Sequence, residues 1–224
     1  MDNTLIFDMD GVLVDSEPAG IFASIKVIES LGFKNVKPEE FKQFTGMGDD
    51  KFISGVLEAH GGVYSKELKQ RMYEIYVNHA KEKVHVYSWS KPIIIELYNI
   101  GFKIAVASAS DFVKVKCNID CIGIDFRILS AVVTGSDIIR NKPAPDIFLK
   151  AAEKSGSNPA RCIVAEDSVA GIKAAKSAGM RAVGVTTTFS EQELYDAGAD
   201  IVVDDLSLLP AIAEGMFSGG FDKI

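Results

Sequence analysis

From residue 91 onward, short apolar runs alternate with stretches whose apolar residues recur at helical spacing. The apolar runs are rich in β-forming residues, which is typical of strands buried on both faces. With the early run Thr4–Phe7, the expected strands are 103–107, 128–133, 162–165, 181–185 and 200–203, and the expected helices are 92–100, 111–120, 146–154, 169–177, 191–196 and 206–214. This alternation predicts an α/β fold, a Rossmann-like doubly wound parallel sheet with helices on both faces.

Residues 18–84 show a different pattern, in which apolar residues recur at helical spacing and no strand is expected. Pro18 suits the first turn of a helix that ends at Gly32, and Ser65 suits the N-cap of a later helix. The pattern predicts an all-helical cap domain over 18–84, inserted into a core domain made of 1–17 and 85–224. The chain would cross between the two domains near 15–18 and again near 84–92, and these two crossings would form a hinge.

Charge and composition narrow the classes of function. The chain has 24 basic and 31 acidic side chains and a formal net charge of −7, which disfavours a nucleic-acid partner. It has no apolar run of the ~20 residues that a membrane span needs. Its three cysteines lack metal-ligand spacing and favour reduced thiols. We expect a monomer or weak oligomer that is cytoplasmic by default, or organellar (for example in the plastid stroma) if an upstream targeting segment has been removed.

Polar side chains follow several predicted strands at the point where each strand ends. Asp8 and Asp10 follow the first strand, and residues i and i+2 of an extended chain project to the same side. Ligands of open α/β sheets bind beyond the carboxyl ends of the strands. One sheet edge would therefore gather four acids, two hydroxyls and a lysine, namely Asp8, Asp10, Glu166, Asp167, Ser108, Ser110 and Lys142. This composition predicts a phosphate site in which hydroxyl, amide and ammonium groups hold phosphoryl oxygens.

Each of these segments can also be explained by a purely structural role. Asp10 can belong to a turn, Ser110 can cap the following helix, and Lys142 can be solvated. Glu166 and Asp167 can be favourable acids at a helix N-terminus. However, four acids in one place require compensation, and carboxylate oxygens of this kind suit Mg²⁺.

The four segments together resemble the motifs of the haloacid dehalogenase superfamily, in the branch of β-phosphoglucomutase-like phosphatases with a helical cap. The matching stretches are Asp8-Met9-Asp10-Gly11-Val12-Leu13, Val106-Ala107-Ser108-Ala109-Ser110, Lys142-Pro143-Ala144-Pro145-Asp146 and Glu166-Asp167-Ser168. The resemblance implies that Asp8 attacks phosphorus to form an aspartyl-phosphate, and that Asp10 acts as acid and then as base. It further implies that Ser108, Ala109 and Lys142 bind the phosphoryl group, and that Asp8, the backbone carbonyl of Asp10 and Asp167, supported by Glu166, hold Mg²⁺.

The resemblance leaves a phosphatase and a phosphosugar mutase as alternatives. The mutases of this family carry a histidine shortly after the first motif, where this chain has Pro18-Ala19-Gly20. The mutases also carry basic residues around a cap loop that matches 44–50, where this chain has Asp49 and Asp50. Because acids repel a second phosphate, we expect a phosphatase that acts on a small phosphorylated metabolite. Lys42 and Lys51 keep the mutase open as an alternative.

The resemblance also bears on the cap loop and on two further classes of function, a dehalogenase and a non-catalytic regulatory domain. By the family resemblance, Gly46, Met47 and Gly48 would contact the part of the substrate beyond the phosphate. A true dehalogenase of this superfamily lacks the second aspartate, so Asp10 argues against that activity. A non-catalytic regulatory domain on the same fold is less expected, because none of the motif residues is lost, although fold alone does not establish function.

Overall fold

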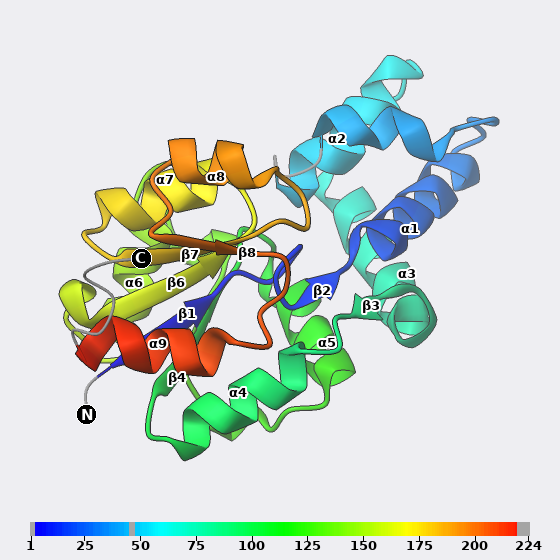
Figure 1. The fold of residues 1–224 in the computed structure, drawn as a ribbon. Helices are drawn as coiled ribbons and strands as arrows, with labels where there is room; N and C mark the ends of the chain where they lie inside the picture. The colour runs from blue at the N-terminus through cyan, green and yellow to red at the C-terminus, as the bar shows by residue number, and fades with distance from the viewer. Residues whose placement is uncertain (1–2, 45–47, 219–224) are drawn as a thin grey trace.

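The computed structural model describes residues 3–44 and 48–218, and within them a six-stranded parallel sheet. The strand order is β5-β4-β1-β6-β7-β8, so the first strand lies in the interior of the sheet (Figure 1). The strands are β1 (Thr4–Phe7), β4 (Lys103–Ala107), β5 (Leu129–Val133), β6 (Cys162–Glu166), β7 (Arg181–Val185) and β8 (Ile201–Val203). The fold class predicted from the sequence is confirmed.

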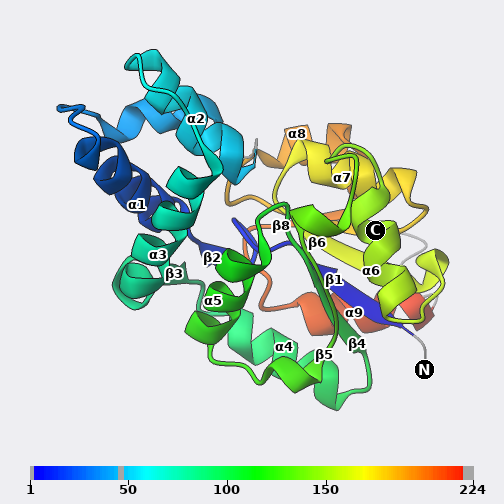
Figure 2. The same cartoon turned by 180° about the vertical axis from the view of Figure 1, so that it is seen from behind.

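Helices cover both faces of this sheet (Figures 1 and 2). Alternate residues of β1 enter different cores, with Leu5 and Phe7 in one apolar cluster and Ile6 in the other. The first cluster includes residues of α4 (Ser90–Asn99), α5 (Phe112–Ile122) and α9 (Leu209–Ser218). The second includes residues of α6 (Asp146–Lys154), α7 (Val169–Ser177) and α8 (Glu191–Asp196). The sheet is therefore buried on both sides, and its polar groups are concentrated at the strand ends.

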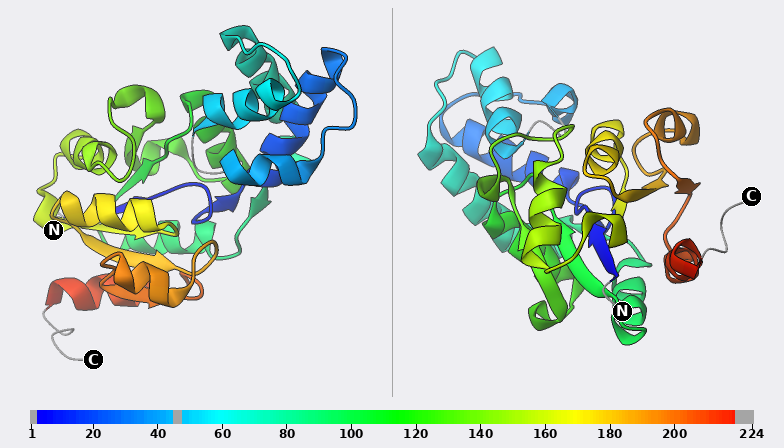
Figure 3. Two further views of the ribbon diagram at one scale, coloured as in Figure 1. Left: turned by 90° about the horizontal axis from the view of Figure 1, so that it is seen from above. Right: turned by 90° about the vertical axis from the view of Figure 1, so that its left-hand side faces the viewer.

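A separate group of helices lies beyond the carboxyl edge of the sheet (Figure 3). It consists of α1 (Glu17–Ser30), the 3₁₀ helix η1 (Pro38–Phe44), α2 (Asp49–Ala59) and α3 (Lys66–Lys83). These helices bury an apolar cluster of their own, which includes Phe41, Leu57 and Tyr76. We propose that residues 18–84 form the cap domain, as the sequence predicts, and call them the cap below.

The two connections between cap and core lie side by side. They contain β2 (Val14–Asp15) and β3 (His85–Val86), which pair antiparallel. The indole Nε1 of Trp89 donates to the carbonyl oxygen of Val12 at 3.0 Å, and the Ser90 hydroxyl donates to that of Leu13 at 2.6 Å. The two short strands occupy the region in which the sequence predicted a hinge.

The structure differs from the predicted elements in a few places. The segment after Pro38 forms a 3₁₀ helix, and the last helix begins at Leu209 rather than at residue 206. Ser110 was a candidate helix cap, and this assignment is wrong, because Asp111 occupies the N-cap of α5. In the described ranges, no helix has the length and apolarity that a membrane span requires.

Candidate active site

Three neighbouring strands bring the predicted site residues to one edge of the sheet. Asp8 directly follows β1, Ser108 directly follows β4, and Glu166 ends β6. Since β1 pairs with both β4 and β6, these three residues emerge next to one another. The backbone N–H of Asp8 donates to the carbonyl of Ala165 at 3.0 Å, which extends the ladder to the site itself.

A buried cluster of three carboxylates forms the centre of this edge. Asp8, Glu166 and Asp167 each offer an oxygen, and these oxygens lie within 4.8 Å of one another. The ammonium of Lys142 enters the cluster from the segment before α6. Its Nζ lies 2.5 Å from Asp8 Oδ1 and 2.7 Å from Glu166 Oε2. Lys142 is thus a largely buried ion-pair partner here and not a solvated side chain.

The cluster carries more negative charge than Lys142 can balance. Burial raises the pKa of Asp8 from 3.8 to about 7, with Glu166 adding to the rise and Lys142 opposing it. Burial, Glu166 and Asp8 also raise the pKa of Asp167 well above its usual value. Burial alone would lower the pKa of Lys142, but Asp8 and Glu166 outweigh it and raise that pKa. Three carboxylates with this deficit of positive charge fit a hard divalent cation such as Mg²⁺.

Two glycines allow the carboxylates to approach the backbone. Gly11 has φ of +81°, and a Cβ there would lie 1.9 Å from Asp167 Oδ2. A Cβ on Gly171, in the first turn of α7, would lie 2.0 Å from Glu166 Cδ. The family resemblance named Gly11 only as part of the first motif, and sequence reasoning missed Gly171.

Hydroxyl and amide donors fix the orientation of the cluster. Ser168 donates to Glu166 Oε1 from its N–H at 3.1 Å and from its Oγ at 2.7 Å. The same Ser168 Oγ accepts from Gly171 N and so caps α7. Thr188 Oγ1 donates to Asp167 Oδ2. Residues 166–168 therefore lead into a helix, as one interpretation predicted, and Glu166 and Asp167 also lie in the carboxylate cluster, where their role in a site stays a prediction. Thr188 was missed, since it lies beyond β7, where no motif marked it.

Asp10 lies outside the carboxylate cluster and contacts residues next to the cap. Its side chain is not in the group of Asp8, Glu166 and Asp167, as far as the described residues go. Asp10 instead accepts a hydrogen bond from Ser16 Oγ, and Lys114 Nζ lies 3.5 Å from its Oδ1. The two aspartates of the first motif therefore have different partners, although both line the same cavity. Asp8 lies against Lys142, and Asp10 faces the space between core and cap.

The segment after β4 forms the opposite wall of the site. Ser108 is buried, and its Oγ accepts from the N–H of Ser110 at 3.2 Å. The carbonyl of Ala109 lies close to Gly135, where a Cβ would approach it to 2.2 Å. Ser108 and Ala109 line the same cavity as Asp8 and Lys142.

This cavity lies between core and cap and has a volume of about 830 Å³. Its core side carries the predicted chemical groups, and its cap side is largely aromatic and apolar. The cap contributes Phe44, Phe52, Met72, Tyr76, Gly48, Asp49 and Lys42 to the lining. Gly48 is therefore placed at the cavity as expected, whereas Gly46 and Met47 lie outside the described residues.

Sequence reasoning also missed Lys114, a largely buried cation that lines the cavity. It lies in α5, one turn beyond Ser110. Burial would lower its pKa, but Asp10 and Asp49 outweigh burial and raise it. The only signal in the sequence was this helical spacing from the polar segment 108–110, which ordinary surface lysines share.

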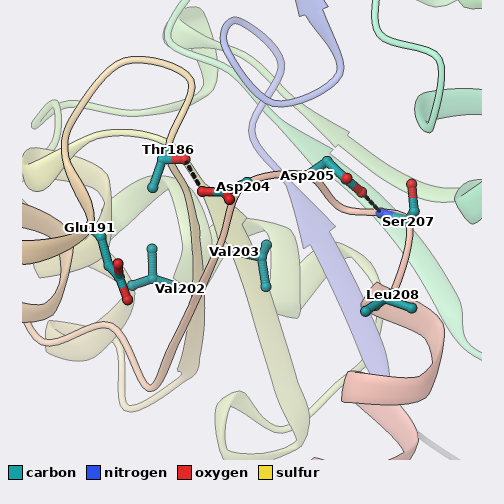
Figure 4. A pocket seen from close by; sticks show the side chains of 8 residues that line it. All are labelled: Thr186, Glu191, Val202, Val203, Asp204, Asp205, Ser207 and Leu208. Carbon is teal, nitrogen blue, oxygen red and sulfur yellow. Dashed lines mark hydrogen bonds between the residues drawn. The ribbon is translucent and has the colours of Figure 1, made fainter.

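A second hollow, of about 350 Å³, lies at the ends of β7 and β8 (Figure 4). Its polar groups bond to their neighbours, with Thr186 Oγ1 donating to Asp204 and Ser207 N donating to Asp205. None of the predicted site residues lines it.

Comparison with known proteins agrees with this geometry. The family model described as haloacid dehalogenase-like hydrolase matches residues 5–185. The β-phosphoglucomutase of Bacillus subtilis is 31% identical over 215 residues, covering 91% of this chain and 89% of that protein. The crystal structure of CbbY from Rhodobacter sphaeroides in complex with phosphate superposes with a TM-score of 0.81 at 25% identity, over 93% of this chain and 96% of that one.

The chain belongs to the haloacid dehalogenase-like hydrolase family, and it is an enzyme of the hydrolase class. Its relatives place it in the β-phosphoglucomutase-like branch, as the motifs predicted. It is also 36% identical, over 225 residues, to the Arabidopsis thaliana protein named SUPPRESSOR OF QUENCHING 1, chloroplastic. That match covers 99% of this chain but only 21% of the relative, so the chain spans about a fifth of that protein's length.

Proposed function

We propose that the protein is a Mg²⁺-dependent phosphomonoester hydrolase that acts on a small organic phosphate of the sugar type. The observation that carries this proposal is the buried Asp8 carboxylate, ion-paired with Lys142 at the floor of a cavity whose other wall is Ser108. A nucleophile, a cation and phosphate-binding donors therefore share one small volume.

The first half of the reaction transfers the phosphoryl group to the protein. An oxygen of Asp8 attacks phosphorus while the bond from phosphorus to the leaving oxygen breaks, which produces an aspartyl-phosphate. Asp10 gives its proton to the leaving oxygen, and its contact with Lys114, which also reaches the cap, supports this role. The Ser108 hydroxyl, the amide of Ala109 and the Lys142 ammonium bind the phosphoryl oxygens.

The second half of the reaction returns the enzyme to its starting state. Asp10, now ionised, takes a proton from a water molecule, and the resulting hydroxide attacks phosphorus. The Asp8–phosphorus bond breaks, so that inorganic phosphate leaves and Asp8 is restored as a carboxylate. One aspartate is therefore the nucleophile, and the other carries the proton in both directions.

The metal would be held by Asp8, the backbone carbonyl of Asp10 and Asp167, with Glu166 in support. Mg²⁺ bound there neutralises charge on the carboxylates and on the phosphate during transfer. Gly11 and Gly171 leave room for Asp167 and Glu166 at this place.

The cap side of the cavity supports a substrate without a second strong anion. Asp49 of the cap and the core residues Asp15 and Glu17 line this part of the cavity, where the cations among the described residues are Lys42 of the cap and Lys114 of the core. An uncharged polyhydroxylated leaving group suits this lining better than a second phosphate does. One relative, 27% identical over 209 residues, is named hexitol phosphatase B of Escherichia coli.

A β-phosphoglucomutase-type activity is the second candidate. It is supported by the Bacillus subtilis relative and by Lys42 and Lys114 on the cavity wall, which are cations suited to a second phosphate. A non-catalytic regulatory role on the same fold is the third and weakest candidate.

The test is phosphate release from a panel of sugar phosphates and related metabolites, with and without Mg²⁺. Asp8→Asn serves as the matched control, because it preserves shape and removes the nucleophile. β-Glucose 1-phosphate with catalytic glucose 1,6-bisphosphate is followed in parallel for glucose 6-phosphate. We expect Mg²⁺-dependent release that Asp8→Asn abolishes. Formation of glucose 6-phosphate without free phosphate would establish the mutase instead, and no turnover of any substrate would favour the regulatory role.

A further inference from the structure

Lys114 is a largely buried cation that contacts both the core and the cap. Its side chain is 12% exposed, and its Nζ lies 3.5 Å from Asp10 Oδ1 in the core. The same Nζ lies 3.5 Å from Asp49 Oδ1, at the first residue of the cap helix α2. One ammonium group therefore bridges the proposed acid–base residue and the element that covers it.

Two further polar contacts lie beside this bridge on the same helix. Asp111 Oδ2 forms an ion pair with Lys69 Nζ of the cap at 2.9 Å. Asn118 Oδ1 accepts a hydrogen bond from the Tyr76 hydroxyl of the cap at 2.5 Å. Residues 111, 114 and 118 are three and four positions apart, so they form one face of α5. This face makes polar contacts with both α2 and α3. Of its three members, Lys114 is the one that also touches Asp10.

We propose that Lys114 is a positioning residue that holds the cap closed over the site and couples that closure to the orientation of Asp10. The role of Asp10 in this inference rests on the proposed function, whereas the bridge to Asp49 does not. A leaving group enclosed by the cap would then meet an Asp10 carboxyl that is already held at its Oδ1.

Removal of the ammonium would turn attraction into repulsion. The oxygens of Asp10 and Asp49 lie no further apart than twice the 3.5 Å that separates each from Nζ. Two carboxylates at such a distance, partly withdrawn from water, repel one another. The cap is joined to the core through the short strands β2 and β3, so movement about that hinge can relieve the repulsion.

The test compares Lys114→Met with variants that isolate the charge. Lys114→Arg keeps a cation, Asp49→Asn removes the repulsion on the cap side, and the double variant Lys114→Met/Asp49→Asn removes both charges of the bridge. Lys116→Met is the matched control, because Lys116 lies on the same helix, is exposed and pairs only with Asp120 among the described residues. Hydrogen exchange of α2 and of the β2–β3 pair is measured without substrate, with β1 and β4 as the internal reference for folding.

We expect Lys114→Met to accelerate exchange in α2 and at the β2–β3 pair, while β1 and β4 stay protected. On the best substrate of the panel, kcat should fall about 10–100-fold with KM changed much less. The reason is that the cap no longer closes fully and the Asp10 carboxyl is no longer held in the orientation for proton transfer. Lys114→Arg should restore much of both properties. The double variant should exchange more slowly than Lys114→Met, and Lys116→Met should match the wild type.

Unchanged exchange in Lys114→Met would overturn the inference, whatever happens to kcat. A rise in KM alone would also overturn it, by making Lys114 a substrate contact. Because exchange is measured without substrate, an inactive wild type would defeat the proposed function and leave the closure test standing. An active wild type with unchanged exchange in Lys114→Met would defeat only this inference.

Discussion

The sheet edge and the cap face each other across one cavity, but they are built in different ways. At the sheet edge, Asp8, Ser108 and Glu166 continue paired parallel strands whose registers fix their separation. On the cap side, the lining comes from helices that pack around their own apolar cluster. Those helices meet the core through side chains such as Tyr76 and Lys69.

The difference suggests that the sheet edge carries out the reaction and that the cap selects the substrate. Groups on paired strands cannot shift without breaking the ladder, which suits atoms that must stay in reacting geometry. Groups on a body joined by two short strands can move together, which suits closure over a leaving group. We therefore expect changes at the sheet edge to remove activity, and changes at the cap to adjust it.

The most severe test of this view is Lys142→Met. The change leaves Asp8 and Glu166 without the ammonium that lies within 2.7 Å of both. We expect kcat/KM for phosphate release to fall by about 10²–10³-fold, the scale on which loss of one preorganised charge-stabilising group acts. Lys150→Met is the control, because Lys150 pairs with Glu153 on the surface of α6, and it should keep full activity. A comparable loss of activity in Lys142→Met and Lys150→Met would contradict the special role given to the sheet edge.

The second test concerns the close approach of backbone and carboxylate. Gly11→Ala places a Cβ 1.9 Å from Asp167 Oδ2 at a φ of +81°, so Asp167 must move. We expect activity to fall about 10–100-fold, as a displacement of about 1 Å near the reacting groups can cause. Gly179→Ala imposes similar strain at a φ of +73° but meets no atom within 4 Å. It should cost about 1 kcal/mol of stability and no activity. Equal losses of activity would show that backbone strain, and not the site, is responsible.

The sequence predicted the residues at the strand ends far better than those within the core helices that complete the site. Its strands follow from period and composition, and Asp8, Ser108 and Glu166 follow from the rule that places ligands at strand ends. Gly171 and Lys114 could not be found in this way. The need for a glycine at 171 arises from a contact with Glu166 that exists only after folding. Lys114 likewise acquires its partners, from α2 and from the segment that follows β1, only in the tertiary structure.

The third test uses the pH dependence of stability in chelator. Because the pKa of Asp8 is raised from 3.8 to about 7, the folded state holds a proton that the unfolded state has already lost between those values. Stability should therefore fall as pH rises from about 4 to 7, by roughly 1.4 kcal/mol for each unit of pKa shift.

The matched variant for this test is Asp8→Asn, which cannot ionise and should lack that part of the pH dependence. Thermal or urea unfolding in chelator at several pH values measures both proteins. Mg²⁺ added at pH 7 should raise the melting temperature of the wild type, because a cation relieves the same repulsion. Parallel pH curves for the two proteins would contradict the assignment of unbalanced charge to the sheet edge.

The smallest effect is expected from Tyr76→Phe, which removes one hydroxyl at the boundary of cap and core. The Tyr76 hydroxyl donates to the fully buried Asn118 Oδ1, whereas the neighbouring Tyr73 hydroxyl donates to Asp49 within the cap at 2.8 Å. Each change to Phe should cost about 1–3 kcal/mol of stability, because a buried or partly buried acceptor loses its donor. The Tyr76 hydroxyl makes its hydrogen bond to the core, whereas the Tyr73 hydroxyl makes its bond within the cap and reaches the core through a further interaction with Asp111. Tyr76→Phe should therefore have the larger effect of the two, lowering kcat by a few fold and accelerating exchange at β2 and β3. If Tyr73→Phe had the same kinetic effect, the internal packing of the cap, and not its attachment to α5, would govern turnover.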